Sequence, residues 1–358
     1  MYTRVVVYVA GLLVVAALAG VVAWRLLGAT STYESAIDTL PRTTLRATYT
    51  DWAQVRDSAG GTTLGSVSSK ADVQAFLTRA YDLDLTSGSA LAESTYAMRE
   101  AYGFSPIDAS WEAFGQGRDG QVDVVRVADG VDLDGVERAL RRLGYTPPRG
   151  GSGTGGVWVG GPDLVAQIDA DLTPVQQNVA VFPDEHLVLM SDNAAYLSTA
   201  TAVAKGSADG LGHVAGVHGL AAAAHEPVAA TQWVSTFACE DLSMGAADDG
   251  DRAEGERLVA RAGDAGPFEG LVMALQPDRS LVVGLHFENA DQADRNLQTR
   301  VDLASGPAPG QGGSFADRFE IASGKADGQD VVITTKPTGR TASVLSDLAS
   351  GPVLFATC

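Results

Sequence analysis

The sequence predicts an α+β protein in which repeated β-hairpin–helix units form antiparallel sheets that are covered by helices. Three observations lead to this fold class. The chain begins with a long uncharged apolar run, Val5–Trp24. A strand–turn–strand pattern followed by an amphipathic helix then recurs along the chain, which suggests two related halves. Hydrophobic residues make up 45% of the 358 residues, which is enough for a sizeable core.

The apolar run Val5–Trp24 has the length and composition of a transmembrane helix. At about 1.5 Å rise per residue it matches a hydrocarbon core of roughly 30 Å. Trp24 stands where an interfacial aromatic side chain belongs. We therefore predict an N-terminal transmembrane anchor over residues 1–27.

A cleaved signal peptide is the alternative interpretation, with a small-residue site at Ala17-Leu18-Ala19. The apolar run continues well past that site, and the apolar part of a signal peptide is normally about 7–15 residues. The anchor is the better fit. Arg4 and Arg25 flank the run and give only a slight charge bias, while the tail before the run is very short. The question is then on which side of the membrane the body lies.

Residues 28–41 are predicted to form a tether between the anchor and the body. A strand is expected at Thr43–Tyr49 because polar and apolar residues alternate there, and a short helix can begin at Asp51-Trp52. Helical spacing of apolar residues predicts helices over Val73–Tyr81 and Leu91–Tyr102.

The first half of the body, residues 42–210, contains two hairpin–helix units. Turn residues at Asp119-Gly120 and Pro183-Asp184 join the expected strand pairs. The strands are Trp111–Gly115 with Val122–Val127, and Val179–Phe182 with Leu187–Met190; the helices that follow are Asp132–Leu143 and Asp192–Val203.

The second half, residues 211–358, repeats the same order. Its strands are Leu271–Leu275 with Leu281–Phe287, and Phe319–Ala322 with Val331–Thr335; its helices are Asn289–Leu303 and Thr338–Leu348, and a last short strand is expected at Val353–Ala356. The four units suggest an internal duplication. Chance resemblance stays open, because identity between the copies is low and the hairpin–helix unit is common.

The net charge of −19 argues against nucleic acid as a partner, because a phosphate surface requires a basic face. It equally disfavours docking of the body on anionic lipid, and it is explained simply by solubility through self-repulsion.

Gly151, Gly153 and Gly156 have the spacing G-x-G-x-x-G of a dinucleotide-binding loop. In such a loop the glycines follow a strand and open a helix. Here Pro147-Pro148 come before the glycines and a strand pattern, Val157-Trp158-Val159, comes after them. We therefore interpret the segment as a flexible linker and expect neither nucleotide nor another cofactor.

No catalytic motif is present in the sequence. The histidines of HVAGVHGLAAAAH lack the i, i+4 spacing of a helical zinc pair, and Gly312-Gly313-Ser314-Phe315-Ala316 lacks the last glycine of G-x-S-x-G. Asp248–Glu256 has Glu254 where a calcium loop needs glycine and is expected to be a solvated acidic loop. We predict no metal site and no catalytic residue, and an enzyme is the less favoured class.

Cys239 and Cys358 are the two cysteines of the chain. Alone they cannot supply a four-ligand zinc site. If the body lies outside the cytoplasm, a Cys239–Cys358 disulfide is the natural expectation, and it would tie down the C-terminus. Two unrelated buried thiols are the alternative.

The stretch from His186 to Gly212, HLVLMSDNAAYLSTATAVAKGSADGLG, resembles a pattern found in predicted secreted or membrane-anchored bacterial proteins of unknown function. The composition, which is rich in Ala, Gly, Asp and Val, is similar to that of proteins from high-GC Gram-positive bacteria. The resemblance covers under a tenth of the chain and implies a location and a fold type, without catalytic residues.

These observations together predict a single-pass cell-membrane protein whose bulk is extracytoplasmic and which has a binding or scaffolding role at the cell envelope. Its expected partners are the membrane, through the N-terminal helix, and an envelope protein or ligand. The alternatives are an envelope hydrolase without a recognisable motif and a structural subunit of a membrane complex. A hydrolase requires a convergent nucleophile, base and oxyanion donor, whereas a binding protein requires a groove or an exposed patch.

Overall fold

The computed structural model describes residues 30–358 except for 66, 150–153, 264 and 340–342. The predicted anchor and the first two glycines of the linker motif lie outside the described residues. Within the described part of the chain, no helix combines the length and the apolar character that crossing a membrane requires.

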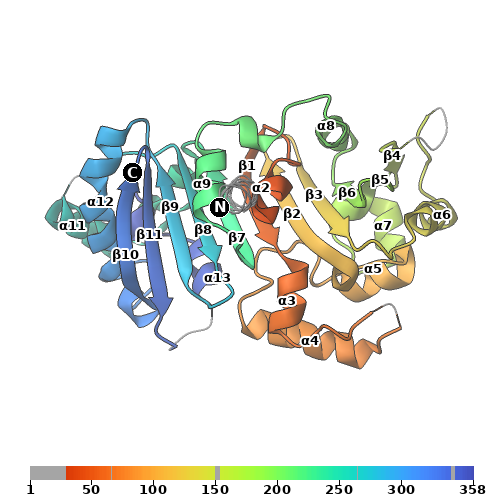
Figure 1. Cartoon of the computed structure of the whole chain (residues 1–358), viewed down its shortest axis with the longest axis horizontal. Coiled ribbons are helices and arrows are strands. Elements are labelled where there is room, and N and C mark those ends of the chain that lie inside the picture. Colours follow the sequence, from red (N-terminus) through yellow and green to blue (C-terminus); the bar gives the residue numbers. More distant parts are fainter. Residues whose placement is uncertain (1–29, 66, 150–153, 264, 340–342) are drawn as a thin grey trace, which may run out of the picture.

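The described chain forms an antiparallel sheet of eleven strands in the order β10-β11-β9-β8-β7-β1-β2-β3-β6-β5-β4 (Figure 1). The predicted α+β class with antiparallel pairing is confirmed. Helix α2 (Thr32–Ile37) lies in the predicted tether and packs on the first half. The first half contains β1 (Thr44–Thr50), α3 (Trp52–Ser58), α4 (Lys70–Asp82), α5 (Thr95–Tyr102), β2 (Ala109–Gly117), β3 (Gln121–Val127), α6 (Leu133–Leu143), β4 (Val157–Val159), α7 (Pro162–Ile168), β5 (Asn178–Phe182), β6 (Leu187–Ser191) and α8 (Ala194–Ala204). The second half contains α9 (Val217–Ala223), β7 (Ala229–Val234), α10 (Phe237–Asp241), α11 (Asp249–Ala262), β8 (Gly270–Leu275), β9 (Leu281–His286), α12 (Ala290–Ser305), β10 (Phe319–Asp327), β11 (Asp330–Pro337) and α13 (Val344–Ala349).

Five strands of each half follow the same order, and β4, at the outer edge of the first half, has no counterpart among the described strands of the second half. Outward from the centre of the sheet, the first half runs β1-β2-β3-β6-β5 and the second half runs β7-β8-β9-β11-β10. The two series meet where β1 pairs antiparallel with β7, from Arg46 opposite Trp233 to Thr50 opposite Ala229. In each half a helix precedes the central strand, a first hairpin and a helix follow it, and a second hairpin and a helix complete the half.

The two faces of the sheet bury different amounts of apolar surface. The larger cluster lies under α3 to α7 in the first half and α10 to α13 in the second half. The smaller cluster lies under α2, α8 and α9 on the opposite face. Burial of these side chains is the main favourable term in folding. The second face is therefore the less completely covered of the two.

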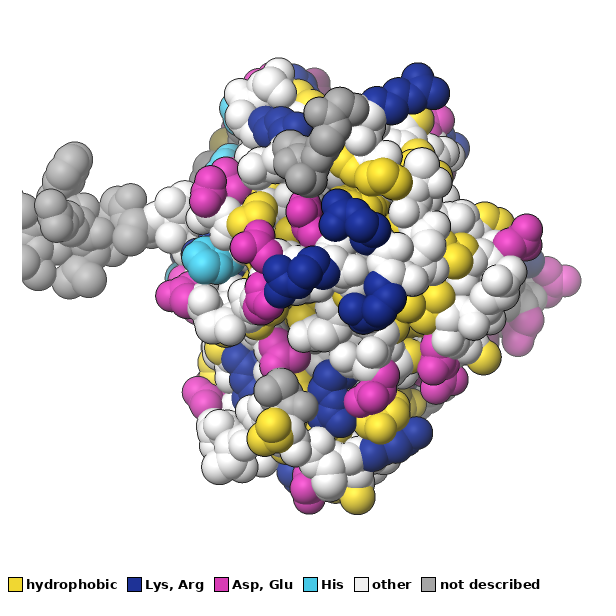
Figure 2. All heavy atoms as spheres, turned by 90° about the vertical axis from the view of Figure 1, so that its right-hand side faces the viewer, with side chains coloured by type: hydrophobic (Ala, Val, Ile, Leu, Met, Phe, Trp, Pro, Cys, Tyr) yellow, Lys and Arg dark blue, Asp and Glu magenta, His cyan; other side chains and the backbone are white. Residues whose placement is uncertain are grey.

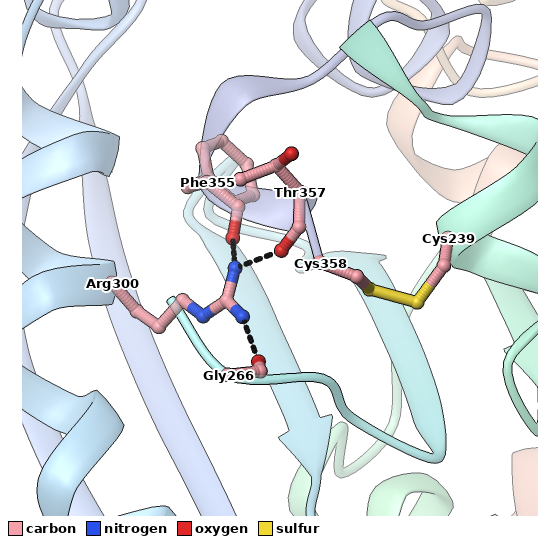
Figure 3. Close-up of a disulfide and its surroundings, with 6 residues drawn as sticks. All are labelled: Cys239, Gly266, Arg300, Phe355, Thr357 and Cys358. Carbon is pink, nitrogen blue, oxygen red and sulfur yellow. Dashed lines mark hydrogen bonds between the residues drawn. A yellow bond between two sulfur atoms is a disulfide. The ribbon is translucent and has the colours of Figure 1, made fainter. Parts of the chain in front are cut away.

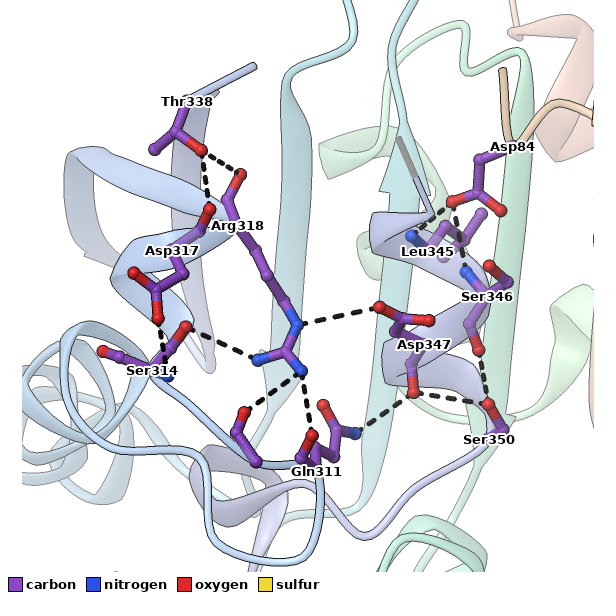
Figure 4. Close-up of polar contacts among 11 residues, drawn as sticks. Asp84, Gln311, Ser314, Asp317, Arg318, Thr338, Leu345, Ser346, Asp347 and Ser350 are labelled. Carbon is purple, nitrogen blue, oxygen red and sulfur yellow. Dashed lines mark hydrogen bonds and ion pairs between the residues drawn. The ribbon is translucent and has the colours of Figure 1, made fainter. Parts of the chain in front are cut away.

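Two buried polar contacts link the halves. Tyr33 of α2 donates its hydroxyl proton to Gln232 Oε1 of β7 at 2.9 Å, and Gln232 Nε2 in turn donates to the Val217 carbonyl at 3.1 Å. On the opposite face, Asp84 Oδ2 accepts from the backbone N–H groups of Leu345 and Ser346 at 2.6 and 3.2 Å (Figure 4). Because these groups begin α13, a carboxylate of the first half caps a helix of the second half.

The disulfide Cys239–Cys358 is present, as predicted, and joins α10 to the C-terminus over a sequence separation of 119 (Figure 3). Beside it the fully buried Arg300 donates from one nitrogen to the Phe355 and Thr357 carbonyls at 2.9 and 2.6 Å. Its other terminal nitrogen donates to the Gly266 carbonyl at 2.5 Å. A guanidinium and a disulfide thus hold the last residues against the core.

Several boundaries differ from the sequence predictions. The predicted tether contains helix α2, which buries Tyr33, Ala36 and Ile37 and begins with a capping box between Ser31 and Glu34. The expected acidic loop at Asp248–Glu256 is wrong, because Asp248 caps helix α11 and its acidic first turn suits the positive end of the helix.

Three further differences occur near helix and strand ends. The expected strand at Val353–Ala356 is instead a 3₁₀ turn, Leu354–Ala356, whose backbone cannot pair with the sheet. The helix expected at Thr338–Leu348 begins only at Val344, because β11 continues to Pro337. The helix expected from Leu91 begins at Thr95, since Ser89 and its neighbours turn to bond Glu112.

Replacement of both cysteines, Cys239→Ser with Cys358→Ser, is predicted to lower the free energy of unfolding by about 4 kcal/mol. The reason is that the unfolded chain loses a loop closure of more than a hundred residues. Urea unfolding of the native and double-variant proteins measures the difference. A reductant should destabilise the native protein by a similar amount and leave the double variant unchanged; equal midpoints without reductant would contradict the prediction.

Candidate functional site

A groove of about 840 Å³ lies on the less covered face of the second half. Helix α9 forms one wall, the hairpin β10–β11 forms the other, and the β8–β9 turn closes one end. In Figure 1 the strands β9, β11 and β10 lie open toward the viewer beside α9. The lining residues are Gly219, Ala222, Ala223, His225, Gln276, Pro277, Asp278, Ser280, Val282, Lys325, Asp327, Asp330, Val332 and Thr334.

The register of the strands produces a floor of mixed polarity. Asp330 and Val332 of β11 pair with His286 and Gly284 of β9, and with Asp327 and Lys325 of β10. Alternate residues of a strand share a face, so Lys325, Asp327, Asp330 and Val332 line the groove while Val331 and Ile333 enter the opposite core. Acidic and aliphatic side chains consequently lie next to each other on the floor.

Two of the three carboxylates that line the groove, those of Asp278 and Asp330, are held by hydrogen bonds. Asp278 accepts from the Ser280 hydroxyl at 2.6 Å and from its backbone N–H at 2.9 Å, and these bonds hold the pKa of Asp278 below its ordinary value. Asp327 lies 3.5 Å from Lys325 Nζ. Asp278 is therefore ionised at neutral pH and adds to the negative charge at the closed end of the groove.

His286 and Asp330 form the most buried polar pair at this site. His286 Nδ1 lies 2.6 Å from Asp330 Oδ1, and the histidine is 7% exposed. Gly216, at the start of α9, has φ +77°, and a Cβ there would lie 2.4 Å from the imidazole ring. Only glycine allows α9 to approach the histidine so closely, so the pair also fixes the position of the groove wall.

The described residues of the groove do not assemble a hydrolytic triad. The Ser280 hydroxyl donates to Asp278, and no hydrogen bond joins a hydroxyl of the described lining residues to an imidazole. The arrangement can bind a ligand through carboxylates, an ammonium group and amide groups around an aliphatic floor.

The sequence-predicted residues lie elsewhere. Cys239 and Cys358 pair on the opposite side of the second half. Of the histidines singled out in the sequence, His225 lines the groove, whereas His218 lies between α2 and α9, with Nε2 3.2 Å from Asp38 Oδ2. In the described ranges, no cluster of three or more His, Cys, Asp or Glu side chains could hold a metal ion. Gly156 leads into strand β4, as the interpretation of that segment expects.

The end of the first half presents a different surface. Figure 2 looks onto this end, and basic and acidic side chains are interspersed over it without a large area of one sign. The net charge of −19 is therefore not concentrated there.

A second unusual feature is a pair of buried carboxyl groups under the first half of the sheet. Glu112 accepts from Trp52 Nε1 at 2.8 Å, from Ser89 Oγ at 2.7 Å and from the Ala90 backbone. Asp123, on the adjacent strand, is fully buried, and neither of its carboxyl oxygens has a hydrogen-bond partner among the described residues.

The second half contains apolar residues at the equivalent places. Counted from the turns, the cross-strand pair Phe114–Asp123 corresponds to Met273–Val283. Burial raises the pKa of Asp123 well above its ordinary value, and the charge of Glu112 raises it further. Burial also raises the pKa of Glu112, against hydrogen bonds that lower it. The first half thus contains an acid whose ionisation opposes folding.

Asp123→Asn is predicted to flatten the pH dependence of stability. The folded pKa of Asp123 lies above its unfolded value, so its penalty is absent below the unfolded pKa, near 4, and grows as the pH rises toward the folded pKa. The native protein should lose stability relative to the variant as the pH is raised from about 4 to 8. Urea unfolding across this range measures the difference, with exposed Asp327→Asn as control; parallel curves for native protein and Asp123→Asn would contradict it.

Comparisons with known proteins leave the chain without a family. No protein-family model and no curated protein matches it. Two solved structures that match are crystal forms I and III of TP0453, at 10% and 9% identity. Each has a TM-score of 0.39; the matches cover 90% and 89% of this chain and 100% and 99% of the other.

Proposed function

We propose that this protein is a membrane-anchored, extracytoplasmic binding protein of the cell envelope that holds a partner in the groove of the second half. The groove beside α9 is the observation that carries the binding role, because it combines an aliphatic floor with fixed carboxylates. The apolar run Val5–Trp24 supports the anchor.

The location outside the cytoplasm is supported by the cysteines. Disulfides persist in oxidising compartments and are rare in the cytosol. Here the bond joins the last residue of the chain to α10. The identical strand order on the two sides of β1 and β7 also supports our proposal that the halves arose by duplication.

The start of the body places the groove close to the proposed anchor. The Thr32 backbone N–H donates to Glu226 Oε1 at 3.0 Å, and His225, the preceding residue, lines the groove. The described chain therefore begins next to one end of the groove wall. A partner that lies at or near the membrane surface would be within reach of this site.

An envelope hydrolase is the second candidate, and His286 with Asp330 is the observation that favours it. A carboxylate that orients an imidazole supplies two of the three members of a nucleophilic triad. A third group would have to approach from the bound ligand or from a partner. We favour binding because the groove hydroxyl of Ser280 is already committed to Asp278.

The placement predicts the behaviour of C-terminal reporter fusions to the full-length chain in a bacterial host. Alkaline phosphatase, which needs an oxidising compartment, should be active, and green fluorescent protein should stay dark. Cys239 and Cys358 should react with a thiol reagent only after reduction. A control chain without residues 1–27 should give the opposite reporter result. A fluorescent fusion of the full-length chain, with Cys239 and Cys358 free to react without reduction, would contradict the proposal.

A further inference from the structure

The two halves differ in how their outer strands are covered. In the second half α9 packs on β8, β9 and part of β11, and none of the described helices packs on β10 on that face. Helix α8 follows the hairpin β5–β6 and packs on β3, β5 and β6, on the face that also carries α2 and α9. Its counterpart in chain order is α13, which follows β10–β11. α13 buries Val344, Leu345 and Leu348 on the opposite face, where Asp84 caps it. The groove lies over β11 and β10, which correspond in strand order to the strands β6 and β5 that α8 covers in the first half.

The wall of the groove permits close approach of another helix. Gly219, Ala222 and Ala223 are the residues that α9 contributes to the lining, and they follow one another at helical spacing. Small side chains let helix axes come near each other, since no long side chain stands between them. The groove beside α9 can therefore accept a helix that lies over β11 and β10.

The floor differs from that of the first half in one respect. Under α8 the sheet presents apolar side chains, among them Val124, Ala180 and Leu189. The equivalent face of the second half mixes Val282 and Val332 with carboxylates and a lysine. A permanently fixed apolar helix would remove these charged groups from water and would leave the surplus of negative charge unbalanced, which is costly. The occupant must supply charge of its own.

The charge of the groove is negative. Asp278, Asp327 and Asp330 line it together with a single lysine, Lys325, which already lies near Asp327. Cationic side chains on the occupant would complement the surplus, and the net charge of −19 would attract such a partner from a distance.

We propose that the groove is the docking site for a basic amphipathic helix of a partner envelope protein. The helix lies in the position that α8 has in the first half. It places a narrow stripe of small or aliphatic residues on Val282 and Val332, and its Lys or Arg side chains meet Asp278 and Asp327. This inference rests on the proposed function and adds the chemistry of the partner.

A photo-reactive benzophenone amino acid at Thr334, on the groove floor, tests the proposal in the full-length chain in its native host membrane. Mass spectrometry of the cross-linked peptide identifies the segment that occupies the groove. We expect a segment of another protein with a helical apolar period and Lys or Arg on the flanking positions. The same amino acid at Ser198, on the exposed surface of α8, is the matched control and should not capture that segment.

Two variants separate docking from chance proximity. Ala222→Trp fills the groove and Asp327→Lys reverses its charge, and each should lower the cross-link yield by about tenfold. Ala195→Trp and Asp163→Lys make the same changes on exposed positions of the first half and should leave the yield unchanged. Higher ionic strength should weaken the native cross-link. Unfolding curves check that all four variants keep their stability.

Other outcomes overturn the inference. These are cross-links to phospholipid, to a second copy of this chain, to residues 1–29, or to a strand-like peptide along β10, and the absence of a cross-link. If the reporter fusions still place the C-terminus outside the cytoplasm, such a result rejects the docking of a basic helix but not the envelope location. A cytosolic C-terminus rejects both proposals.

Discussion

The antiparallel pairing of β1 with β7 is the constraint on which the rest of the architecture depends. It joins the five-strand series of each half, together with β4 at the outer edge of the first half, into one continuous sheet, with Thr48 opposite Thr231 at the junction. Both strands are buried on both faces for most of their length. A break there would expose the backbone hydrogen-bonding groups of two central strands, which proteins rarely leave unpaired in their interior.

The asymmetry of the molecule follows from where its last helix goes. α13 lies under the central strands of the second half, where Asp84 supplies its N-terminal hydrogen bonds and Arg46 donates to the carbonyl of Ala349 at its end. Since Asp84 and Arg46 both belong to the first half, their hydrogen bonds to α13 hold the two halves together. Because α13 lies on this face, the other face of the second half is covered by α9 alone among the described helices, and β10 is left uncovered there.

The two halves also differ in the residues that their central hairpins, β2–β3 and β8–β9, bury. In the second half, Leu271 and Val283 fill the core beneath the helices. In the first half Glu112 and Asp123 hold the equivalent positions. The second half therefore has aliphatic residues at these two positions and a polar groove on its other face, whereas the first half has two acids there and an apolar layer under α8.

Much of the sheet can be predicted from local patterns. Asp119-Gly120 and Pro277-Asp278 mark turns, and the strands on either side are apolar on the faces that the sheet buries. β7 could not be found in this way. Its sequence, Ala229–Val234, has no alternation because the strand is buried on both faces.

Helices α2 and α11 have recognisable N-terminal capping residues, but the neighbouring glycines and small residues favour a loop interpretation. Ser31 and Glu34 have the spacing of a capping box, yet the glycine and small residues before them resemble a tether. Gly250 and Gly255 have low helix propensity, so the helix that begins after Asp248 is not evident from the sequence. Gly255 is the one buried residue of α11. Asp123 could have been noticed, because it shares a strand face with the apolar residues Val125 and Val127.

The groove itself is beyond sequence reasoning. Its floor is built from strands whose pairing depends on the whole fold, and His286 meets Asp330 across 44 residues of chain. The polar alternation of Lys325 and Asp327 on β10 is that of any solvated strand face. The position of α13 on the other side of the sheet leaves the face over β10 uncovered, and α9 supplies the wall of the groove.

The contact between Tyr33 and Gln232 also bears on how the molecule responds to force. The described chain begins just before α2, and this short helix lies against both the first central strand and α9. A pull transmitted along the chain from its amino-terminal side would reach the sheet at the junction of its halves rather than at an outer strand. Peeling from an edge would then be avoided, and the load would be shared by the buried backbone pairs of β1 and β7.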